Sequence, residues 1–364
     1  MLRTLVFVLA ALAATGTTLS LLSSYRWYIR MWDFPRVALM LIAAVALIIA
    51  VPALAGWTRI VVAVAMVLVI GWQGVRIYPY TTLAKTEVAK AVINRENCIK
   101  AFSFNVLQTN RDYPRTISLV QREDPDIVLL LETDQLWEDA LRPVIDTYPH
   151  RFSAPLDNLY GLILLTRLPV EDAEVTWLID NETPSVFATM KTEAGGRFRY
   201  IGLHPRPPAP GQSTKKRDGE IAIAARYAKE TKLPVLAMGD FNDVAWSRTS
   251  QMFKRIGGYL DPRIGRGLYA TFPANLPGLR WPLDHIFMSP DFTLVDMKVL
   301  ENVGSDHLPV IVEVCLAPRA AKVLNDDPDT PDASDHQDMH EAIRDGKQAA
   351  REEGTTSGGS PPPP

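Results

Sequence analysis

The hydrophobic positions of this sequence fall into two regions with different patterns. The first 80 residues contain three long uncharged apolar stretches, whereas the rest of the chain alternates between short apolar runs and polar segments. A helix needs about 20 apolar residues to cross the hydrocarbon core of a bilayer. The pattern therefore predicts a membrane region over residues 1–80, with three transmembrane helices at 5–22, 37–57 and 60–80.

The first apolar stretch has a second interpretation, because a run that follows Arg3 is also typical of a cleaved signal peptide. We favour three spans, since two further stretches follow directly. Cytoplasmic loops carry an excess of Lys and Arg. With the N-terminus outside, the cytoplasmic side would hold Arg26, Arg30, Arg36, Arg76, Lys85 and Lys90, against Arg3 and Arg59 outside. This bias favours a cytoplasmic position for the rest of the chain.

Beyond a linker at residues 81–98, the pattern predicts strands that alternate with helices. Residues 126–131 form a continuous apolar run, as in a strand buried on both faces. Further strands are expected at 99–106, 162–165, 187–191, 197–203, 234–238, 283–288 and 310–314, with helices at 116–123 and 221–229. This order indicates one α/β domain over residues 99–318. Residues 319–364 are acidic and then rich in Gly, Ser and Pro, which predicts a disordered tail.

Charge and cysteine content narrow the class of function only slightly. Residues 81–318 carry 27 basic and 30 acidic side chains. The domain therefore lacks the broad positive surface that gives sequence-independent affinity for nucleic acids. The two cysteines, Cys98 and Cys315, make no disulfide framework and neither lies in a metal-ligand pair. They leave the cellular compartment undecided.

Polar residues that can perform catalysis follow the predicted strands at the points where the strands end. A single residue of this kind is usually a turn former, but the repeated pattern predicts a site at one sheet edge. Carboxylate oxygens suit a hard cation such as Mg²⁺, and imidazoles suit proton transfer. The residues are Asn105, Glu132, His204, Asp240, Asn242, Asp284, Asp306 and His307.

The motifs around these residues resemble those of the endonuclease/exonuclease/phosphatase superfamily, whose members have the DNase I-like fold. The most specific are G-D-F-N at 239–242 and S-D-H-L-P at 305–309, and F-N-V, L-L-E, G-L-H and L-D-H-I also occur in the family's order. The resemblance covers about residues 99–316. It implies a four-layer α/β/β/α sandwich with two central sheets. Three leading apolar stretches further resemble the membrane-attached bacterial branch, which implies a multi-pass protein of the inner membrane.

The resemblance implies that three residues belong to the metal site. Glu132 matches the metal carboxylate, Asn105 lies beside it to orient metal-bound water or phosphate, and Asp306 matches a second carboxylate on the metal side. The implied cofactor is Mg²⁺ or Mn²⁺. Leu107 stands where nucleases of the family often carry an acid, which argues against a second metal and, more mildly, against a nuclease. The number of metals stays open.

Five residues are implied in catalysis. Asp240 matches the residue that aligns or deprotonates the attacking water, and Asn242 matches its partner that holds the phosphate. His204 matches a donor to the phosphoryl oxygens or the leaving group. His307 matches the histidine that faces the phosphate, with Asp284 orienting its ring. Members of the family differ in which of Asp240 and His307 is the general base, so this assignment stays open.

These expectations describe a membrane-anchored, metal-dependent phosphoesterase that uses an activated water. The predicted membrane helices and the near-neutral domain favour a lipid phosphate or pyrophosphate as substrate. A nucleic acid is the alternative, favoured by the family and by the basic triplet Lys215-Lys216-Arg217. A hypothesis of another class is a catalytically inactive membrane scaffold, against which the complete set of site residues argues. The sequence indicates no oligomeric state.

Overall fold

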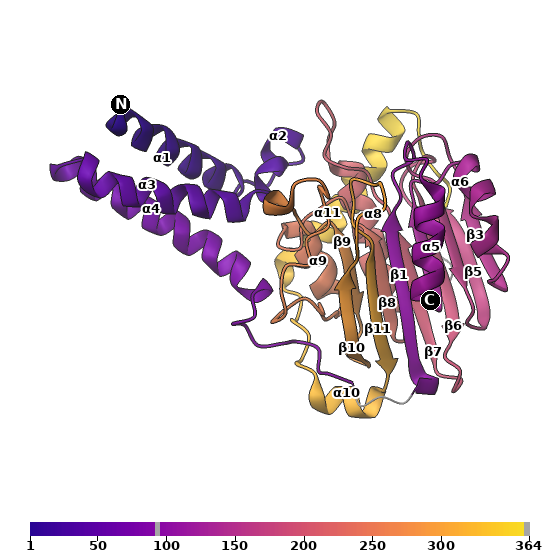
Figure 1. Ribbon diagram of the computed structural model, residues 1–364. Coiled ribbons are helices and arrows are strands. Elements are labelled where there is room, and N and C mark those ends of the chain that lie inside the picture. The colour runs from indigo at the N-terminus through magenta and orange to yellow at the C-terminus, as the bar shows by residue number, and fades with distance from the viewer. Residues whose placement is uncertain (92–94, 360–364) are drawn as a thin grey trace. The chain divides into compact units, whose positions relative to one another are not determined.

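The computed structural model describes residues 1–91 and 95–359, which form two compact units (Figure 1). The first unit contains residues 1–85 with the short segments 208–214 and 265–267. The second contains residues 86–207, 215–264 and those from 268 onward. This division separates the apolar N-terminal region from most of the remaining chain.

Three apolar helices make up most of the first unit, namely α1 (Leu2–Leu19), α3 (Arg36–Ala53) and α4 (Gly56–Ile77). Small side chains such as Ala13, Ala43 and Ala46 are buried between them, as is usual for helices packed in a membrane. Each helix is long and apolar enough to cross a membrane, so the structure contains three candidate spans at the predicted places. Three short helices complete the region: α2 (Trp27–Arg30), η1 (Met31–Asp33) and η2 (Tyr78–Tyr80).

Two β-sheets form the centre of the second unit. The first has the order β10-β11-β1-β2-β4-β3, and the second has the order β5-β6-β7-β8-β9. The strands of the first sheet are β1 (Cys98–Asn105), β2 (Ile127–Leu131), β3 (His150–Ala154), β4 (Leu162–Thr166), β10 (Phe292–Val299) and β11 (Val310–Leu316). Those of the second sheet are β5 (Val170–Trp177), β6 (Pro184–Lys191), β7 (Arg197–Leu203), β8 (Val235–Asp240) and β9 (Asp284–Met288).

Successive side chains of a strand point to opposite faces of its sheet, and the buried apolar side chains form three layers. Leu129 of the first sheet and Leu236 of the second belong to one cluster between the sheets. On the outer face of the first sheet, Phe104 and its neighbours pack with α5 (Tyr113–Glu123), α6 (Gln135–Ala140) and α7 (Arg142–Ile145). On the outer face of the second sheet, Phe287 and its neighbours pack with α8 (Lys215–Glu230), α9 (Arg248–Gly257) and α11 (Ala333–Glu352). The structure therefore confirms the four-layer α/β/β/α sandwich (Figure 1).

The strands that the apolar pattern did not predict lie at sheet edges. β3 and β10 flank the first sheet and β5 flanks the second. An edge strand exposes part of its surface, so its sequence carries polar residues and lacks a clear period. In β5, for example, three of eight residues are exposed and one is fully buried. Two further short helices, η3 (Arg95–Asn97) and η4 (Pro277–Leu279), lie in loops.

The expectation of a disordered tail at residues 319–364 is wrong for its described part. Residues 318–324 form α10 (Pro318–Leu324), and α11 packs on α8 and α9 through an apolar face that includes Met339 and Ile343. Gly219 and Gly346 let α8 and α11 approach closely, since a Cβ atom on either would meet the other's Cα at 3.2 Å. The tail looked solvated because it carries ten acidic residues against five basic ones and no clear apolar period. Two of those acids, Asp335 and Asp338, pair with Arg255 and Arg248 of α9.

Removal of α11 is therefore expected to destabilise the protein. Full burial of a side chain such as Met339 or Ile343 contributes about 1.5–3 kcal/mol, and each kcal/mol shifts the melting temperature by about 2–4 °C in a domain of this size. Truncation after Asp332 should lower the melting temperature by roughly 5–15 °C. Ile343→Asp should also lower it, whereas Gln348→Asp on the exposed face of α11 should not. Unchanged melting of the truncated chain would show that α11 does not dock in solution.

Candidate active site

Both sheets bring polar residues to one common edge. β1 and β2 are parallel neighbours, so Asn105 at the end of β1 and Glu132 directly after β2 emerge side by side. β7 and β8 are parallel as well, which brings His204 and Asp240 together. Asp284 begins β9 and pairs directly with Asp240 across the antiparallel ladder. The sheet topology thus assembles residues that are up to 179 positions apart in sequence.

The side-chain amide of Asn105 connects the two sheets. Its Nδ2 donates to Glu132 Oε1 at 2.9 Å and to Asp240 Oδ2 at 3.1 Å, while its Oδ1 accepts from the Leu107 N–H at 3.1 Å. The second oxygen of Glu132 accepts from the Gln108 N–H at 3.2 Å. Leu107 and Glu132 have left-handed backbones, with φ of 61° and 60°. Non-glycine residues in this conformation are strained, and they concentrate at functional sites.

His307 lies between two carboxylates. Its Nδ1 is 2.9 Å from Asp284 Oδ2, and its Nε2 is 3.5 Å from Asp240 Oδ2. Burial alone would lower the pKa of His307, but the Asp240 and Asp284 carboxylates outweigh it and raise that pKa to about 10. The imidazole is therefore protonated at neutral pH, with Asp284 fixing the orientation of its ring. The ring of Phe272, 4.8 Å away between centroids, covers one side of the imidazole.

His204 has the opposite electrostatic character. Burial lowers the pKa of His204 to about 4, and the nearby Asp240 carboxylate only partly compensates. Its Nε2 lies 3.8 Å from Asp240 Oδ2. Tyr160 lies against the His204 ring with centroids 5.5 Å apart. The Arg206 guanidinium lies over the Tyr160 ring, 5.1 Å from its centroid. The site thus pairs one neutral and one charged imidazole around the same carboxylate.

The carboxylate cluster fits a divalent cation. Burial raises the pKa of Glu132, and the charges of Asp240 and Asp306 raise it further. A cation would relieve this repulsion, and oxygen ligands are those that Mg²⁺ prefers. Ligand atoms of Asp240, Asp284 and His307 also lie within 4.8 Å of one another. That trio suits a metal less well, because the His307 nitrogen that faces Asp284 is already hydrogen-bonded and protonated His offers no lone pair to a metal.

Asp306 is the predicted site residue with the least direct contact to the others. Its backbone carbonyl accepts from the Ala274 N–H at 2.7 Å, and the Ser305 hydroxyl lies 3.4 Å from its Oδ1. Asp306 is half-buried, and the negative charge of its carboxylate helps to raise the pKa of Glu132. The remaining seven predicted residues are connected by hydrogen bonds or close contacts, or, for Asn242, by the loop that follows Asp240 at the end of β8.

The loop that follows β8 is held by Arg217, a member of the basic triplet that favoured a nucleic acid as substrate. Asn242, with a left-handed φ of 49°, donates its N–H to Asp240 Oδ1 at 2.9 Å and its side-chain amide to the Pro205 carbonyl at 3.0 Å. Arg217 Nη1 donates to the Asn242 carbonyl at 2.9 Å, and its Nη2 lies 3.3 Å from Asp243 Oδ2. Arg217 is buried in the first turn of α8. The basic triplet is therefore mainly structural, and it gives no support to a nucleic-acid surface.

A second buried arginine supports the same loop through a histidine. Arg263 pairs with Asp261 at 2.8 Å and donates from Nη2 to His285 Nδ1 at 2.8 Å. Because arginine can only donate, His285 must carry its proton on Nε2, which contacts the Asp243 carbonyl at 2.8 Å. Burial, with the Arg263 charge, lowers the pKa of His285 well below its usual value, so the ring is neutral. The chain Asp261–Arg263–His285–Asp243 therefore positions the backbone of the G-D-F-N loop.

Sequence reasoning missed these supporting residues because their contacts are not local. Arg217, Arg263 and His285 occur in ordinary sequence surroundings, and only the adjacency of His285 to Asp284 in L-D-H-I gave a signal. The aromatic walls of the site, Tyr160 and Phe272, also lie in loops without a period. Arg280 donates to the Ala274 carbonyl and holds the loop that carries Phe272.

A fully buried carboxyl group lies beside this site. Glu220 of α8 accepts from the Ser185 hydroxyl at 2.7 Å and from the Thr183 hydroxyl at 3.2 Å. Burial raises the pKa of Glu220 to about 8, with a further contribution from Asp180. Asp180 in turn contacts Arg206 at 3.0 Å, two residues after His204. Because the folded state binds this proton more tightly than the unfolded chain does, the free energy of unfolding depends on the protonation of Glu220.

Glu220→Gln is expected to remove part of the pH dependence of unfolding. The folded-state pKa exceeds the ordinary glutamate value of 4.5, so above that pH the folded state holds a proton that the unfolded chain has lost. Stability then falls as pH rises from about 4.5 to about 8. The variant should gain melting temperature relative to wild type over this range and level off above it. Glu230→Gln, an exposed acid on the same helix, is the matched control. A pH-independent difference would contradict the assignment.

The chain is similar to known proteins of one family. The Endonuclease/Exonuclease/phosphatase family matches residues 102–307. No curated protein matches the whole sequence closely enough to count as a relative. Among solved structures, a mannosyl-6-phosphatase of Bacteroides thetaiotaomicron superposes with a TM-score of 0.50 at 21% identity, over 59% of this chain and 99% of the other. Humanized D. rerio TDP2 gives a TM-score of 0.49 at 16% identity, over 60% and 99%. The human Nocturnin catalytic domain, with bound sulfate, gives 0.49 at 17% identity, over 62% and 96%.

The family match spans more than half of the chain and contains the strands and loops that bring the polar cluster together. It begins within β1, which ends at Asn105, and it ends at His307. The chain therefore belongs to the endonuclease/exonuclease/phosphatase family and is a hydrolase of phosphoric ester bonds.

Proposed function

We propose that the protein is a membrane-anchored phosphoesterase that hydrolyses a lipid phosphate or pyrophosphate. The observation that carries the proposal is the pairing of the Asn105–Glu132 cluster with the Asp284–His307–Asp240 chain at one sheet edge. Glu132, with Asn105 and Asp306, would hold Mg²⁺ or Mn²⁺. The cation would supply positive charge to the phosphoryl oxygens.

The protein's own residues then handle the water and its proton. Asp240 Oδ2 lies within 4 Å of both His204 and His307. Asp240 aligns the attacking water and takes its proton, the protonated His307 beside it stabilises the developing negative charge, and Asp284 holds the His307 ring in place. Neutral His204 donates an N–H to the phosphoryl oxygens or to the leaving group. The Asn242 side-chain amide donates to the Pro205 carbonyl and so fixes the loop that carries Asp240.

Several features favour a lipid over the alternatives. The three apolar helices suggest that the catalytic residues work close to a bilayer. Tyr160 and Phe272 lie against the two catalytic histidines, where they would contact the apolar or sugar part of a substrate. Lys216 and Arg217, which favoured nucleic acid at the sequence level, are buried and paired with Asp180 and Asp243. The inactive scaffold also loses support, because the polar residues converge instead of lying scattered.

A substrate panel tests this proposal on the detergent-solubilised full chain with Mg²⁺. Matched pairs should be compared: phosphatidic acid with glycerol phosphate, and an isoprenoid diphosphate with inorganic pyrophosphate, with single-stranded DNA as a separate arm. We expect kcat/KM at least about tenfold higher for the lipid member of a pair, because binding energy from the remote lipid part lowers the barrier. His307→Ala, whose activity added Mg²⁺ should not restore, serves as the control for background hydrolysis. Faster cleavage of DNA, or equal rates within both pairs, would contradict the lipid assignment.

A further inference from the structure

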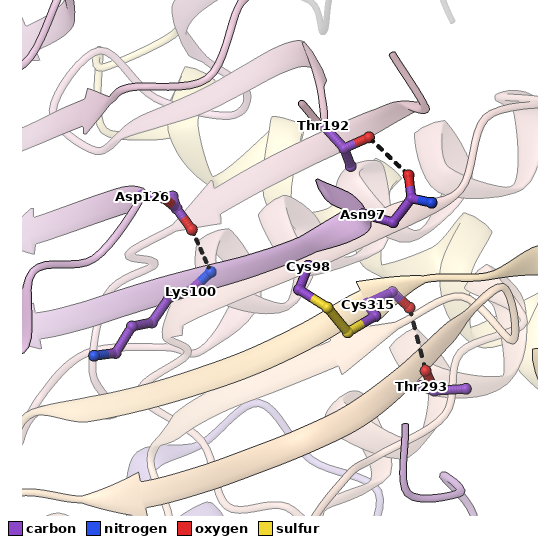
Figure 2. Close-up of a disulfide and its surroundings, with 7 residues drawn as sticks. All are labelled: Asn97, Cys98, Lys100, Asp126, Thr192, Thr293 and Cys315. Carbon is purple, nitrogen blue, oxygen red and sulfur yellow. Dashed lines mark hydrogen bonds between the residues drawn. A yellow bond between two sulfur atoms is a disulfide. The ribbon is translucent and has the colours of Figure 1, made fainter. Parts of the chain in front are cut away.

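The two cysteines of the chain form a disulfide between neighbouring strands. Cys98 is the first residue of β1, and Cys315 lies opposite it near the end of β11, with an S–S distance of 1.96 Å (Figure 2). The bond therefore joins the first and last strands of the domain, across 217 positions of sequence. β1 ends at Asn105, so the disulfide is at the opposite end of this strand from the catalytic cluster.

The surroundings of the disulfide are those of a structural bond. Cys315 is 1% exposed, and its carbonyl accepts from the Thr293 hydroxyl at 3.4 Å. On the other side, Asn97 and Thr192 contact each other at 3.1 Å beside Cys98 (Figure 2). Exchange with a solution thiol needs access to a sulfur atom. Cys315 is buried and Cys98 half-buried, and the pair lies at the far end of β1 from the reacting groups, so it is unsuited to redox catalysis.

Disulfides form and persist in oxidising compartments and are rare in the cytosol, where the exceptions are mostly transient and catalytic. Both cysteines of this protein are used in one structural bond between neighbouring strands. We infer that the catalytic domain lies on the extracytoplasmic side of the membrane and acquires the Cys98–Cys315 disulfide there. With three spans, this orientation places the N-terminus in the cytoplasm.

This orientation is opposite to the one that the Lys and Arg count favoured. Two of the six Lys and Arg residues in that count stabilise the first unit through ion pairs and a hydrogen bond. Arg30 and Arg36 lie 3.4 and 2.7 Å from Asp33, and Arg36 also donates to Gln73 of α4 at 3.1 Å. These side chains are buried and connect helices. Their presence on this side of the membrane therefore has a physical reason other than orientation.

The orientation also narrows the substrate, a step that rests on the proposed function. A catalytic domain outside the cytoplasm meets no cytoplasmic nucleotides or nucleic acids. It does meet phosphate and pyrophosphate headgroups on the outer leaflet of the membrane that anchors it. The substrate class is then a lipid phosphate exposed on that leaflet, supplied by a reaction that leaves a phosphorylated lipid carrier or headgroup there.

Thiol trapping in intact cells tests the disulfide directly. The full chain is expressed in a Gram-negative bacterial host, cells are quenched in acid, free thiols are blocked with N-ethylmaleimide, and a maleimide–polyethylene glycol reagent follows with or without reductant. We expect no adduct without reductant and an adduct on both cysteines after it. Cys98→Ser should leave one blocked thiol and no adduct under either condition. Blocked thiols in the wild type would overturn the inference.

Reporter fusions after Pro364 test the orientation. Alkaline phosphatase, which is active only outside the cytoplasm, should be active there, and green fluorescent protein should remain dark. A fluorescent and phosphatase-inactive pair would overturn the inference even if the disulfide were present. Glu132→Gln should give the same trapping and fusion results as wild type. A positive orientation with no hydrolysis of any phosphate ester would therefore reject the proposed function alone.

Discussion

His307→Ala is expected to lower kcat by roughly 10²-fold or more, the scale on which lost acid–base or electrostatic groups act. The substitution removes an imidazolium that lies 2.9 Å from Asp284 and 3.5 Å from Asp240. It also leaves two buried carboxylates near each other without the positive charge between them. Added Mg²⁺ should not restore the rate, because the lost group handles the proton and charge of the reaction.

The matched control for this variant is His340→Ala, which removes an exposed imidazole on α11. Its kcat should equal that of wild type. Because the buried carboxylate pair could unfold the chain, the melting temperature of His307→Ala is measured in parallel, and His307→Gln provides a neutral side chain of similar reach. A loss below about tenfold in folded His307 variants would place the reacting groups elsewhere.

Glu132→Gln is expected to produce a loss of activity that depends on Mg²⁺. The amide keeps the size of the side chain and one oxygen that can accept from Asn105, but it removes the charge that attracts the cation. Activity should therefore fall most at low Mg²⁺ and recover in part at high Mg²⁺, since the defect is chiefly one of occupancy. Glu193→Gln, an exposed acid, should behave as wild type.

Cation binding can be followed without activity. A ligand that binds only the folded state raises the melting temperature in proportion to the logarithm of its concentration relative to Kd. Wild type should show this rise with Mg²⁺, and Glu132→Gln should need higher concentrations for the same rise. If both proteins melted identically at every Mg²⁺ concentration, Glu132 would not belong to a cation site.

Much of the candidate site could be predicted because it depends on local patterns. Runs such as 126–131 identify buried strands, and parallel strands bring their carboxyl ends to the same edge. The positions of Glu132 and Asp240 therefore followed from the apolar pattern, and the G-D-F-N and S-D-H-L-P motifs assigned them to a family. The three apolar helices were equally visible, since a bilayer imposes a minimum apolar length.

Other features depended on contacts between distant parts of the chain. α11 carries eight charged residues among its 20, and its narrow apolar face is buried only because α8 and α9 present an apolar surface to it. Arg217 looks like a solvated charge in the sequence, yet it is buried against the Asn242 carbonyl and Asp243. A charged side chain is stable in such a place only when specific partners surround it, and the sequence does not reveal those partners.

The disulfide is the clearest example of a feature that the sequence alone did not determine. The cysteine count excluded a disulfide framework, but it could not show whether Cys98 and Cys315 meet. The answer depends on β1 pairing with β11 in the register that places these two residues opposite each other. Local sequence determines that a segment is a strand through its apolar period, whereas pairing and register are determined by the packing of both faces of the sheet. Features that follow from the period were therefore predictable, and those that follow from pairing required the tertiary structure.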